Sequence, residues 1–208
     1  LLAARAGEPT GLPRARPEEV GISSERLNRV DEVIRRYIEQ KKISGAVTLV
    51  ARRGRVVHHE ARGVMDIESK APMRTDAIFR MASSTKPVTG VAILMLIEEG
   101  KVGMTDPVSK YLPDRVTVPE RNNRKITLAD LSTQSSGLPR LPNNLAPKNP
   151  NNPYADYTEE RLYAFLSSHQ LARRPGEKYE YSNLGMGLLG FTLVKQAGMS
   201  YEALMKRR

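Results

Sequence analysis

The sequence predicts an α+β protein, in which a helical region accompanies an antiparallel sheet. Residues 46–52 and 55–62 are predicted to be two strands that turn at Arg53 and Gly54. Much of the remaining chain has apolar residues at helical spacing, with capping residues where the periodic stretches begin. Because 39% of the residues are hydrophobic and 27% are charged, we expect a packed globular core.

We divide the chain into an arm and one domain. Residues 1–22 are rich in Pro, Gly and Arg and are predicted to be an N-terminal arm. The first helix and the hairpin occupy residues 23–66, and a mainly helical region occupies residues 67–208. Within that region, residues 138–153 are so rich in Pro and Asn that we expect a long surface loop. The predicted helices are, in order, 23–42, 83–99, 127–134, 158–168, 182–197 and one that starts at Ser200.

The predicted sheet is incomplete. The stretch AVTLVA (46–51) is apolar on both faces, which is typical of a central strand covered on both sides. A two-stranded hairpin is only marginally stable by itself. We therefore expect further strands beyond Arg208, so that this chain is the N-terminal part of a longer protein or one product of a cut chain.

Composition excludes several kinds of site. The chain has no cysteine, which rules out disulfides, thiol nucleophiles and Cys-ligated metals and leaves the redox compartment open. His58 and His59 are neighbours on a predicted strand and point to opposite faces, and His169 stands alone at a helix end. Carboxylates do not cluster in the sequence either, so we predict no metal site and no cofactor.

The net charge of +10 raises the question of a nucleic-acid partner. Lys and Arg are scattered, with short clusters such as Arg173 and Arg174, and aromatic residues make up 5%, too few for a stacking platform. A solvated basic surface accounts for this charge, so we expect no nucleic-acid partner. No apolar run approaches the length of a membrane span.

The first residues bear on localisation. Ala4-Arg5-Ala6 matches the end of an export signal, and it matches an expression tag or cloning remnant about as well. We favour an extracytoplasmic location in a bacterium, periplasmic or secreted, over a cytoplasmic one.

MASSTKPVTG, residues 81–90, holds a Ser-x-x-Lys pair made of Ser83 and Lys86. The pattern is weak alone, because about one match is expected by chance, and a Ser near a helix N-cap with a Lys one turn later accounts for it. Serine becomes a good nucleophile once a base takes its proton, and residues i and i+3 share a helix face, so Lys86 can place its amine beside Ser83. Pro87 is tolerated only in the first turn, so the helix begins near Ser83 and directs the positive end of its dipole there.

A second element is Tyr181-Ser182-Asn183, the one Y-x-N match in the sequence. It lies between a predicted turn at Pro175 and Gly176 and a predicted helix, where a phenol can face a cleft. The alternative is a Tyr that ends an extended segment, with Ser182 as the helix cap. By itself the motif favours that alternative.

Four ordered segments together resemble the serine β-lactamase-related proteins: FRMASSTKPVTG, DPVSKYLP, ITLADLSTQSSGLP and PGEKYEYSNLGMGLLG. That family includes class C β-lactamases, D-alanyl-D-alanine carboxypeptidases and the family VIII carboxylesterases. The resemblance extends from about Val20 to Tyr201. It implies a β-lactamase/transpeptidase-like fold, present here as its N-terminal part.

The resemblance also implies roles for four residues. Ser83 is expected to be the nucleophile that accepts the acyl group, with its backbone N–H as half of the oxyanion hole. Lys86 is expected to be its base or proton relay, and Tyr181 a second proton-transfer group whose pKa Lys86 lowers. Asn183 is expected to hydrogen-bond the amide of the substrate or a bound water. The LPRLPNN loop (138–144) is expected to form part of the cleft wall.

The chain departs from the family pattern in two places. Where the family commonly has LLTHTSG, this chain has LSTQSSG, with Gln134 in place of the His. We expect packing or hydrogen bonding to differ there, and not the reaction. The K-T-G or H-x-G strand that usually supplies the other oxyanion N–H is absent, which agrees with the incomplete sheet.

We predict a serine hydrolase that acts through an acyl-enzyme on ester or amide carbonyls, such as β-lactams or D-Ala-peptide-like substrates. The sequence does not choose between esterase, β-lactamase and peptidase, and the 208-residue piece lacks the strand that completes the site. The alternative is a non-catalytic penicillin-binding-like relative that binds a peptide or a protein partner. The expected partners are a small ester, a β-lactam or a peptidoglycan-like peptide, and the C-terminal remainder of the same protein.

Overall fold

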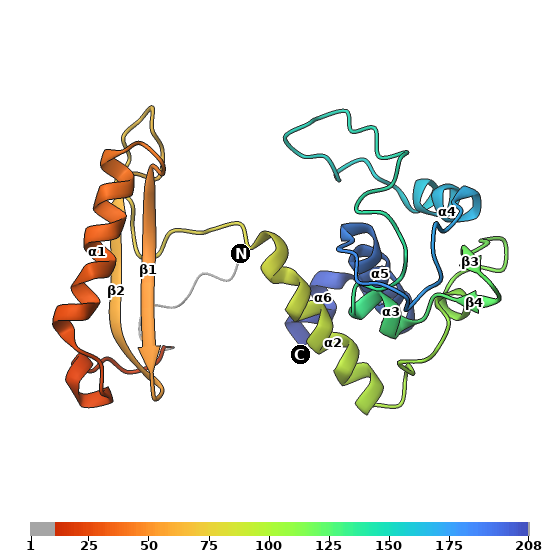
Figure 1. Ribbon diagram of the computed structural model, residues 1–208, viewed down its shortest axis with the longest axis horizontal. Helices are drawn as coiled ribbons and strands as arrows, with labels where there is room; N and C mark the ends of the chain where they lie inside the picture. The colour runs from red at the N-terminus through yellow and green to blue at the C-terminus, as the bar shows by residue number, and fades with distance from the viewer. Residues whose placement is uncertain (1–10, 208) are drawn as a thin grey trace. The chain divides into compact units, whose positions relative to one another are not determined.

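The computed structural model describes residues 11–207, without the side chain of Arg207, and divides into two compact units, one up to Arg80 and one from Met81. The stretch Ala4-Arg5-Ala6, on which the export signal was considered, lies outside the described residues, as does the first part of the predicted arm. The described chain combines helices with a small antiparallel sheet, so the α+β prediction is confirmed (Figure 1).

The N-terminal unit is a helix laid along a hairpin (Figure 1). Helix α1 (Ser24–Glu39) begins where Ser23 Oγ accepts from the N–H of Arg26 at 3.3 Å, as a helix cap does. Strands β1 (Gly45–Arg52) and β2 (Arg55–Gly63) pair antiparallel along their whole length, with one bulge near the turn. The hairpin is the one that the sequence predicts.

Three positions in the hairpin have positive φ angles. Arg53 and Gly54 have φ of +52° and +70°, the pattern of a two-residue turn whose twist matches that of the strands. At Gly63 (φ +79°), a Cβ atom would lie 2.3 Å from the carbonyl oxygen of Ser44, so only glycine fits there.

The described part of the arm lies along the hairpin. The N–H of Ala15 donates to the carbonyl of Val56 at 3.0 Å, and the N–H of Val56 donates to the carbonyl of Pro13 at 2.8 Å. The chain then forms a short 3₁₀ helix, η1 (Pro17–Val20), whose last residue is buried.

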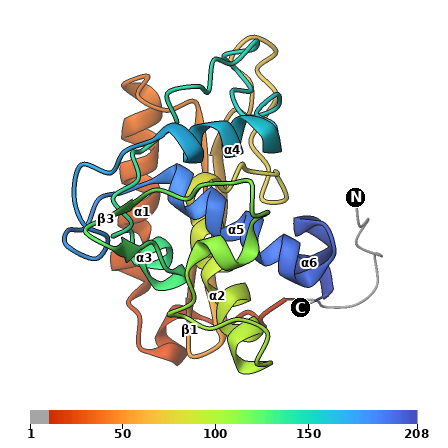
Figure 2. The same ribbon diagram turned by 90° about the vertical axis from the view of Figure 1, so that its right-hand side faces the viewer.

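The regular secondary structure of the C-terminal unit is mainly helical, and α5 runs through it with the other helices around it (Figure 2). Each helix predicted from the sequence in this unit is present, with bounds that differ by a few residues at most. In chain order the helical elements are η2 (Ala82–Ser84), α2 (Thr85–Glu98), η3 (Val108–Tyr111), α3 (Leu128–Ser132), α4 (Glu159–Ser168), α5 (Asn183–Ala197) and α6 (Tyr201–Arg207). Helix α3 starts with a capping box, because the side chains of Thr127 and Asp130 each accept from the other residue's backbone N–H.

A second, very small hairpin was not predicted. Strands β3 (Glu120–Arg121) and β4 (Arg124–Lys125) pair around Asn122 and Asn123, which have φ of +53° and +55°. Each strand has two charged residues and no apolar alternation, so the pattern that reveals a strand is missing.

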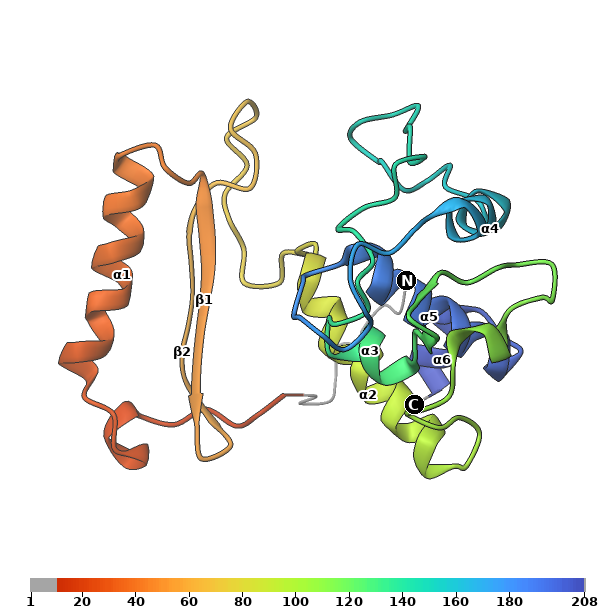
Figure 3. The ribbon, with the colours of Figure 1, turned by 45° about the vertical axis from the view of Figure 1, so that its right-hand side comes forward.

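The long loop that the sequence predicts is present between α3 and α4. Residues 138–153 contain no helix and no strand, and the segment is drawn in teal in Figure 3. Among residues 11–207, no helix combines the length and the apolar character that crossing a bilayer requires.

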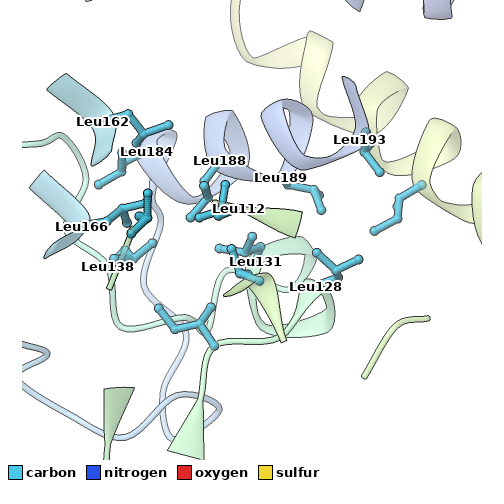
Figure 4. Close-up of a cluster of buried hydrophobic side chains, with 14 of the residues drawn as sticks. Leu112, Leu128, Leu131, Leu138, Leu162, Leu166, Leu184, Leu188, Leu189 and Leu193 are labelled. Atoms are coloured by element: carbon cyan, nitrogen blue, oxygen red, sulfur yellow. The ribbon is translucent and has the colours of Figure 1, made fainter. Parts of the chain in front are cut away.

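Leucines form most of the core of the C-terminal unit. Figure 4 shows leucines of α3, α4 and α5 gathered in one cluster. Fully burying one such side chain contributes about 1.5–3 kcal/mol relative to leaving it in water. The buried leucines drawn there with labels are Leu112, Leu128, Leu131, Leu138, Leu162, Leu166, Leu184, Leu188, Leu189 and Leu193. This cluster fixes the position of α5 and of the segment just before it.

Truncation of one of these leucines should be costly. Leu189 has no exposed surface, so Leu189→Ala is expected to lower the free energy of unfolding by about 2–5 kcal/mol. Denaturant titration of the full-length protein measures the loss. Leu189→Met is the matched control, since it keeps the volume and should cost less than about 1.5 kcal/mol. Equal losses for both variants would contradict the packing described above.

Candidate active site

Three side chains that the sequence predicts to be catalytic meet at one hydroxyl group. The Ser83 Oγ and the Tyr181 hydroxyl are 2.7 Å apart. Lys86 Nζ donates to the same Ser83 Oγ at 3.0 Å, and it lies 4.8 Å from the centroid of the Tyr181 ring, within the range of a cation–π contact. All three belong to the C-terminal unit, and Ser83 is exposed. We call these three residues the hydroxyl cluster.

The start of helix α2 presents Ser83. Ala82 has φ of +46°, in the left-handed region that residues other than Gly rarely adopt. The chain turns there, passes through η2 and enters α2 at Thr85. Pro87 stands in the first turn of α2, where a backbone N–H has no acceptor within the helix. Ser83 and Lys86 therefore lie together near the positive end of the helix dipole, as predicted.

The surroundings of Tyr181 favour its ionised form. Hydrogen bonds from Lys86 and Ser83 hold the pKa of Tyr181 below its ordinary value of 10, and the positive charges of Lys86 and Arg140 act in the same direction. The guanidinium of Arg140 lies 5.1 Å from the centroid of the Tyr181 ring. Both cations stabilise a phenolate at this position.

Gln134 holds the backbone on both sides of Tyr181. Its backbone carbonyl accepts from the N–H of Glu180 at 2.7 Å, and its side-chain Oε1 accepts from the N–H of Ser182 at 2.6 Å. Gln134 is buried and has φ of +60°, so its backbone turns back towards the segment that carries Tyr181. Arg173 and Glu180 form an ion pair beside this segment. The phenol is thus carried by a fixed piece of chain.

The N-terminus of α5 fixes the two residues after Tyr181. Ser182 Oγ caps the helix by accepting from the N–H of Gly185 at 2.8 Å, and it donates to the carbonyl of Pro139 at 2.7 Å. The carbonyl of Arg140 accepts from the N–H of Asn183 at 3.1 Å. Asn183 lines a cavity beside the site, and within residues 11–207 no hydrogen bond joins its side chain to the hydroxyl cluster.

Sequence reasoning missed Arg140 and did not find the role of Gln134. Arg140 belongs to no motif. The one feature of the sequence that points to it is its place in the loop 138–144, which was expected to form part of the cleft wall. Two other residues of this loop, Leu141 and Pro142, line the cavity beside Asn183. Gln134 stood out as a departure from the family pattern, but its partners lie more than 40 positions away in the sequence.

Two of the three histidines have partners other than the hydroxyl cluster. His58 shares a hydrogen bond of 2.7 Å with Thr48 on the neighbouring strand. His169 stacks on Phe165, and burial lowers its pKa. In the part of the chain that the structure describes, no three His, Cys, Asp or Glu residues are grouped as a metal ion requires.

The sequence and the fold of this chain are similar to those of known proteins. The sequence model of the Beta-lactamase family matches residues 30–208, which is most of the chain. The chain belongs to the Beta-lactamase family. The resemblance drawn from the four sequence segments is thereby confirmed, and so is the β-lactamase/transpeptidase-like fold.

Individual relatives and one solved structure extend the comparison. The chain is 30% identical to Protein flp of Staphylococcus aureus (strain N315) over 181 residues, 86% of this chain and 35% of that protein. It is 36% identical to esterase EstB of Burkholderia gladioli over 111 residues, 53% of this chain and 28% of that protein. The crystal structure of a beta-lactamase/D-alanine carboxypeptidase from Yersinia pestis superposes with a TM-score of 0.78 at 29% identity. That match covers 89% of this chain and 53% of the Yersinia chain. The chain therefore spans about a third of the curated relatives that it matches and about half of this solved structure.

Removal of the charge on Arg140 should shift the ionisation of Tyr181. Arg140→Met removes a positive charge that favours the phenolate, so the pKa of Tyr181 is expected to rise towards 10. The backbone carbonyl of residue 140, which holds α5, remains. Titration of tyrosine absorbance measures the shift, with Tyr181→Phe to identify the signal. Arg115→Met is the control, because Arg115 lies over another tyrosine ring. A fall in the pKa of Tyr181 in Arg140→Met would contradict the role given to Arg140. An equal rise of this pKa in Arg115→Met would contradict it as well.

Removal of the acceptor on Gln134 should loosen Tyr181. Gln134→Met keeps the approximate shape and leaves the N–H of Ser182 buried without its acceptor, which should cost about 1–3 kcal/mol of unfolding free energy. Thermal or denaturant unfolding measures the loss. Gln196→Met is the matched control, since Gln196 is exposed and its amide donates to a single carbonyl, that of Lys101. A change at Gln134 no larger than at Gln196 would argue against this role.

Proposed function

We propose that this protein is a serine hydrolase that acts through an acyl-enzyme on ester or amide carbonyls. The observation that carries the proposal is the hydroxyl cluster, in which Lys86 and Tyr181 both contact the Ser83 Oγ. Membership of the Beta-lactamase family supports it. EstB is named as an esterase and the Yersinia protein as a beta-lactamase and carboxypeptidase, so both ester and amide carbonyls are considered.

The proton balance assigns different tasks to the two partners of Ser83. A lysine ammonium has donors only, so a charged Lys86 cannot accept the serine proton. A Tyr181 phenolate can accept it, and its lowered pKa makes the phenolate more abundant than for an ordinary tyrosine at the same pH. Ser83 Oγ then bonds to the carbonyl carbon while its proton passes to the Tyr181 oxygen. Lys86 stabilises the phenolate before the attack.

Tyr181 also carries the proton in the remaining steps of the reaction. The Tyr181 hydroxyl returns its proton to the leaving oxygen or nitrogen as the bond to the carbonyl carbon breaks. Water then attacks the carbonyl carbon of the ester formed on Ser83 and gives up a proton to the Tyr181 phenolate. As the bond between that carbon and the Ser83 Oγ breaks, Tyr181 passes this proton to the Ser83 Oγ, and the acid is released. The backbone N–H of Ser83 and the positive end of the α2 dipole are proposed to stabilise the negative charge that develops on the carbonyl oxygen. Asn183 is proposed to contact the substrate from the cavity side.

Substitution of the nucleophile tests the proposal directly. In the full-length protein, Ser83→Ala is expected to lower kcat/KM for an activated ester such as p-nitrophenyl acetate by at least about 10³-fold. Ser84→Ala is the matched control, since Ser84 is the next residue, is also exposed and contributes no side chain to the cluster. Its turnover should stay close to that of the unsubstituted protein.

A mapping experiment separates catalysis from binding alone. The full-length protein is treated with a β-lactam or an activated ester, digested, and searched for the adduct by mass spectrometry. The adduct should lie on the peptide with Ser83. Labelling of another residue would sink the mechanism, and so would unchanged turnover in Ser83→Ala. Labelling without any turnover would instead indicate a non-catalytic, penicillin-binding-like relative.

A further inference from the structure

An apolar cavity lies inside the C-terminal unit, and Asn183, two positions after Tyr181, is one of its lining residues. Its volume is about 320 Å³, and its walls come from the long loop before α4, from the start of α4 and from the first half of α5. The apolar side chains that make up most of the wall are Leu141, Leu145, Tyr154, Leu162, Leu184 and Phe191. This volume lies at the lower end of the range for small-molecule sites.

The wall offers no unpaired charge to a ligand. Glu159 is the one charged residue in the lining, and both of its carboxylate oxygens accept from Lys195 Nζ at 2.9 Å. The hydroxyl of Tyr163 donates to the same carboxylate. Tyr157 donates its hydroxyl to Asn144 at 3.1 Å. An uncharged apolar group therefore suits this cavity, whereas a charged group would find no counter-ion in its wall.

The cavity is joined to the hydroxyl cluster by two short pieces of chain. Asn183 lines the cavity and stands two positions after Tyr181, whose hydroxyl contacts Ser83. Leu141 lines it as well and follows Arg140, whose guanidinium lies over the Tyr181 ring. The carbonyl of Arg140 accepts from the N–H of Asn183, so these two pieces are held together.

We propose that this cavity receives the apolar chain of an ester whose carbonyl is attacked by Ser83. The proposal rests on the proposed function and narrows its substrate class to esters with an uncharged, aliphatic or aromatic chain. The cavity has room for roughly ten groups of the size of a water molecule, so a chain of up to about that many carbons fits. A peptidoglycan-like peptide, with its charged ends, would bring charge to a wall that has no partner for it.

A series of esters tests the chain preference. The full-length protein is assayed with p-nitrophenyl esters from acetate to decanoate, and with alkyl acetates whose alcohol chain grows over the same range. Each methylene that enters the cavity should raise kcat/KM about fourfold, as follows from its transfer free energy. A rise in the first series places the acyl chain in the cavity, and a rise in the second places the alcohol chain there.

Substitution of Gly187 shows whether the cavity causes the preference. Gly187 lines the cavity from α5, and a Cβ atom there meets nothing within 4 Å. Gly187→Leu should therefore occupy part of the space and lower the ratio of kcat/KM for octanoate to acetate about tenfold or more. Gly187→Ala is the matched control, since it changes the same helix position by one methyl group and should shift the ratio far less. If Gly187→Leu does not fold, Tyr154→Ala removes a partly exposed piece of the wall and should lower the same ratio.

The outcomes separate this proposal from the one that it rests on. If kcat/KM rises with chain length and Gly187→Leu removes this rise, the cavity is supported as the site of the chain. Ser83-dependent turnover with no dependence on either chain, or with a dependence that Gly187→Leu leaves intact, overturns the cavity proposal and keeps the hydrolase. Absence of Ser83-dependent turnover for every ester overturns both.

Discussion

The hydrogen bond between Ser83 and Tyr181 joins residues 98 positions apart, and it depends on how α2 and α5 pack. Gly190 of α5 faces α2 closely, since a Cβ atom there would lie 3.8 Å from the Thr89 methyl group. Thr89 in turn shares a hydrogen bond of 2.7 Å with the Tyr201 hydroxyl of α6. The geometry of the site is thus set by the core of the C-terminal unit. A shift of α5 by about one ångström would therefore be expected to change the distance between the Tyr181 hydroxyl and the Ser83 Oγ.

The segment that carries Tyr181 is held mainly by backbone carbonyls. Pro139, Arg140 and Gln134 each offer a carbonyl to this segment or to the first turn of α5. The bonds to the Gln134 and Arg140 carbonyls join backbone to backbone and do not depend on side-chain rotamers, and bonds to buried groups are expensive to lose. They hold the backbone of the segment whose phenol lies next to two cations. A proton-transfer group needs this combination of fixed backbone and tuned charge.

The sequence was informative where local chemistry decides the structure. The turn at Arg53 and Gly54, the caps at Ser23 and Thr158, and the i, i+3 spacing of Ser83 and Lys86 each act within a few residues, and the structure has them all. The meeting of Tyr181 with Ser83 was expected from the family resemblance and not from any local pattern. The roles of Gln134 and Arg140 were out of reach, because a buried amide that serves a backbone N–H 48 positions away leaves no periodicity in the sequence. The β3–β4 hairpin was missed because its strands are too short and too polar to alternate.

The replacement at position 134 has a chemical consequence for the site. A histidine there would have one ring nitrogen able to accept from the N–H of Ser182 while neutral, and none once protonated, because both nitrogens then donate. Its charge would change between about pH 5 and 8, so the anchor of Tyr181 would weaken on the acid side. The Oε1 of Gln134 accepts at every pH in that range. In this chain the position of Tyr181 is therefore independent of any titration at residue 134. The pKa of Tyr181 is lowered by hydrogen bonds from Lys86 and Ser83 and by the positive charges of Lys86 and Arg140.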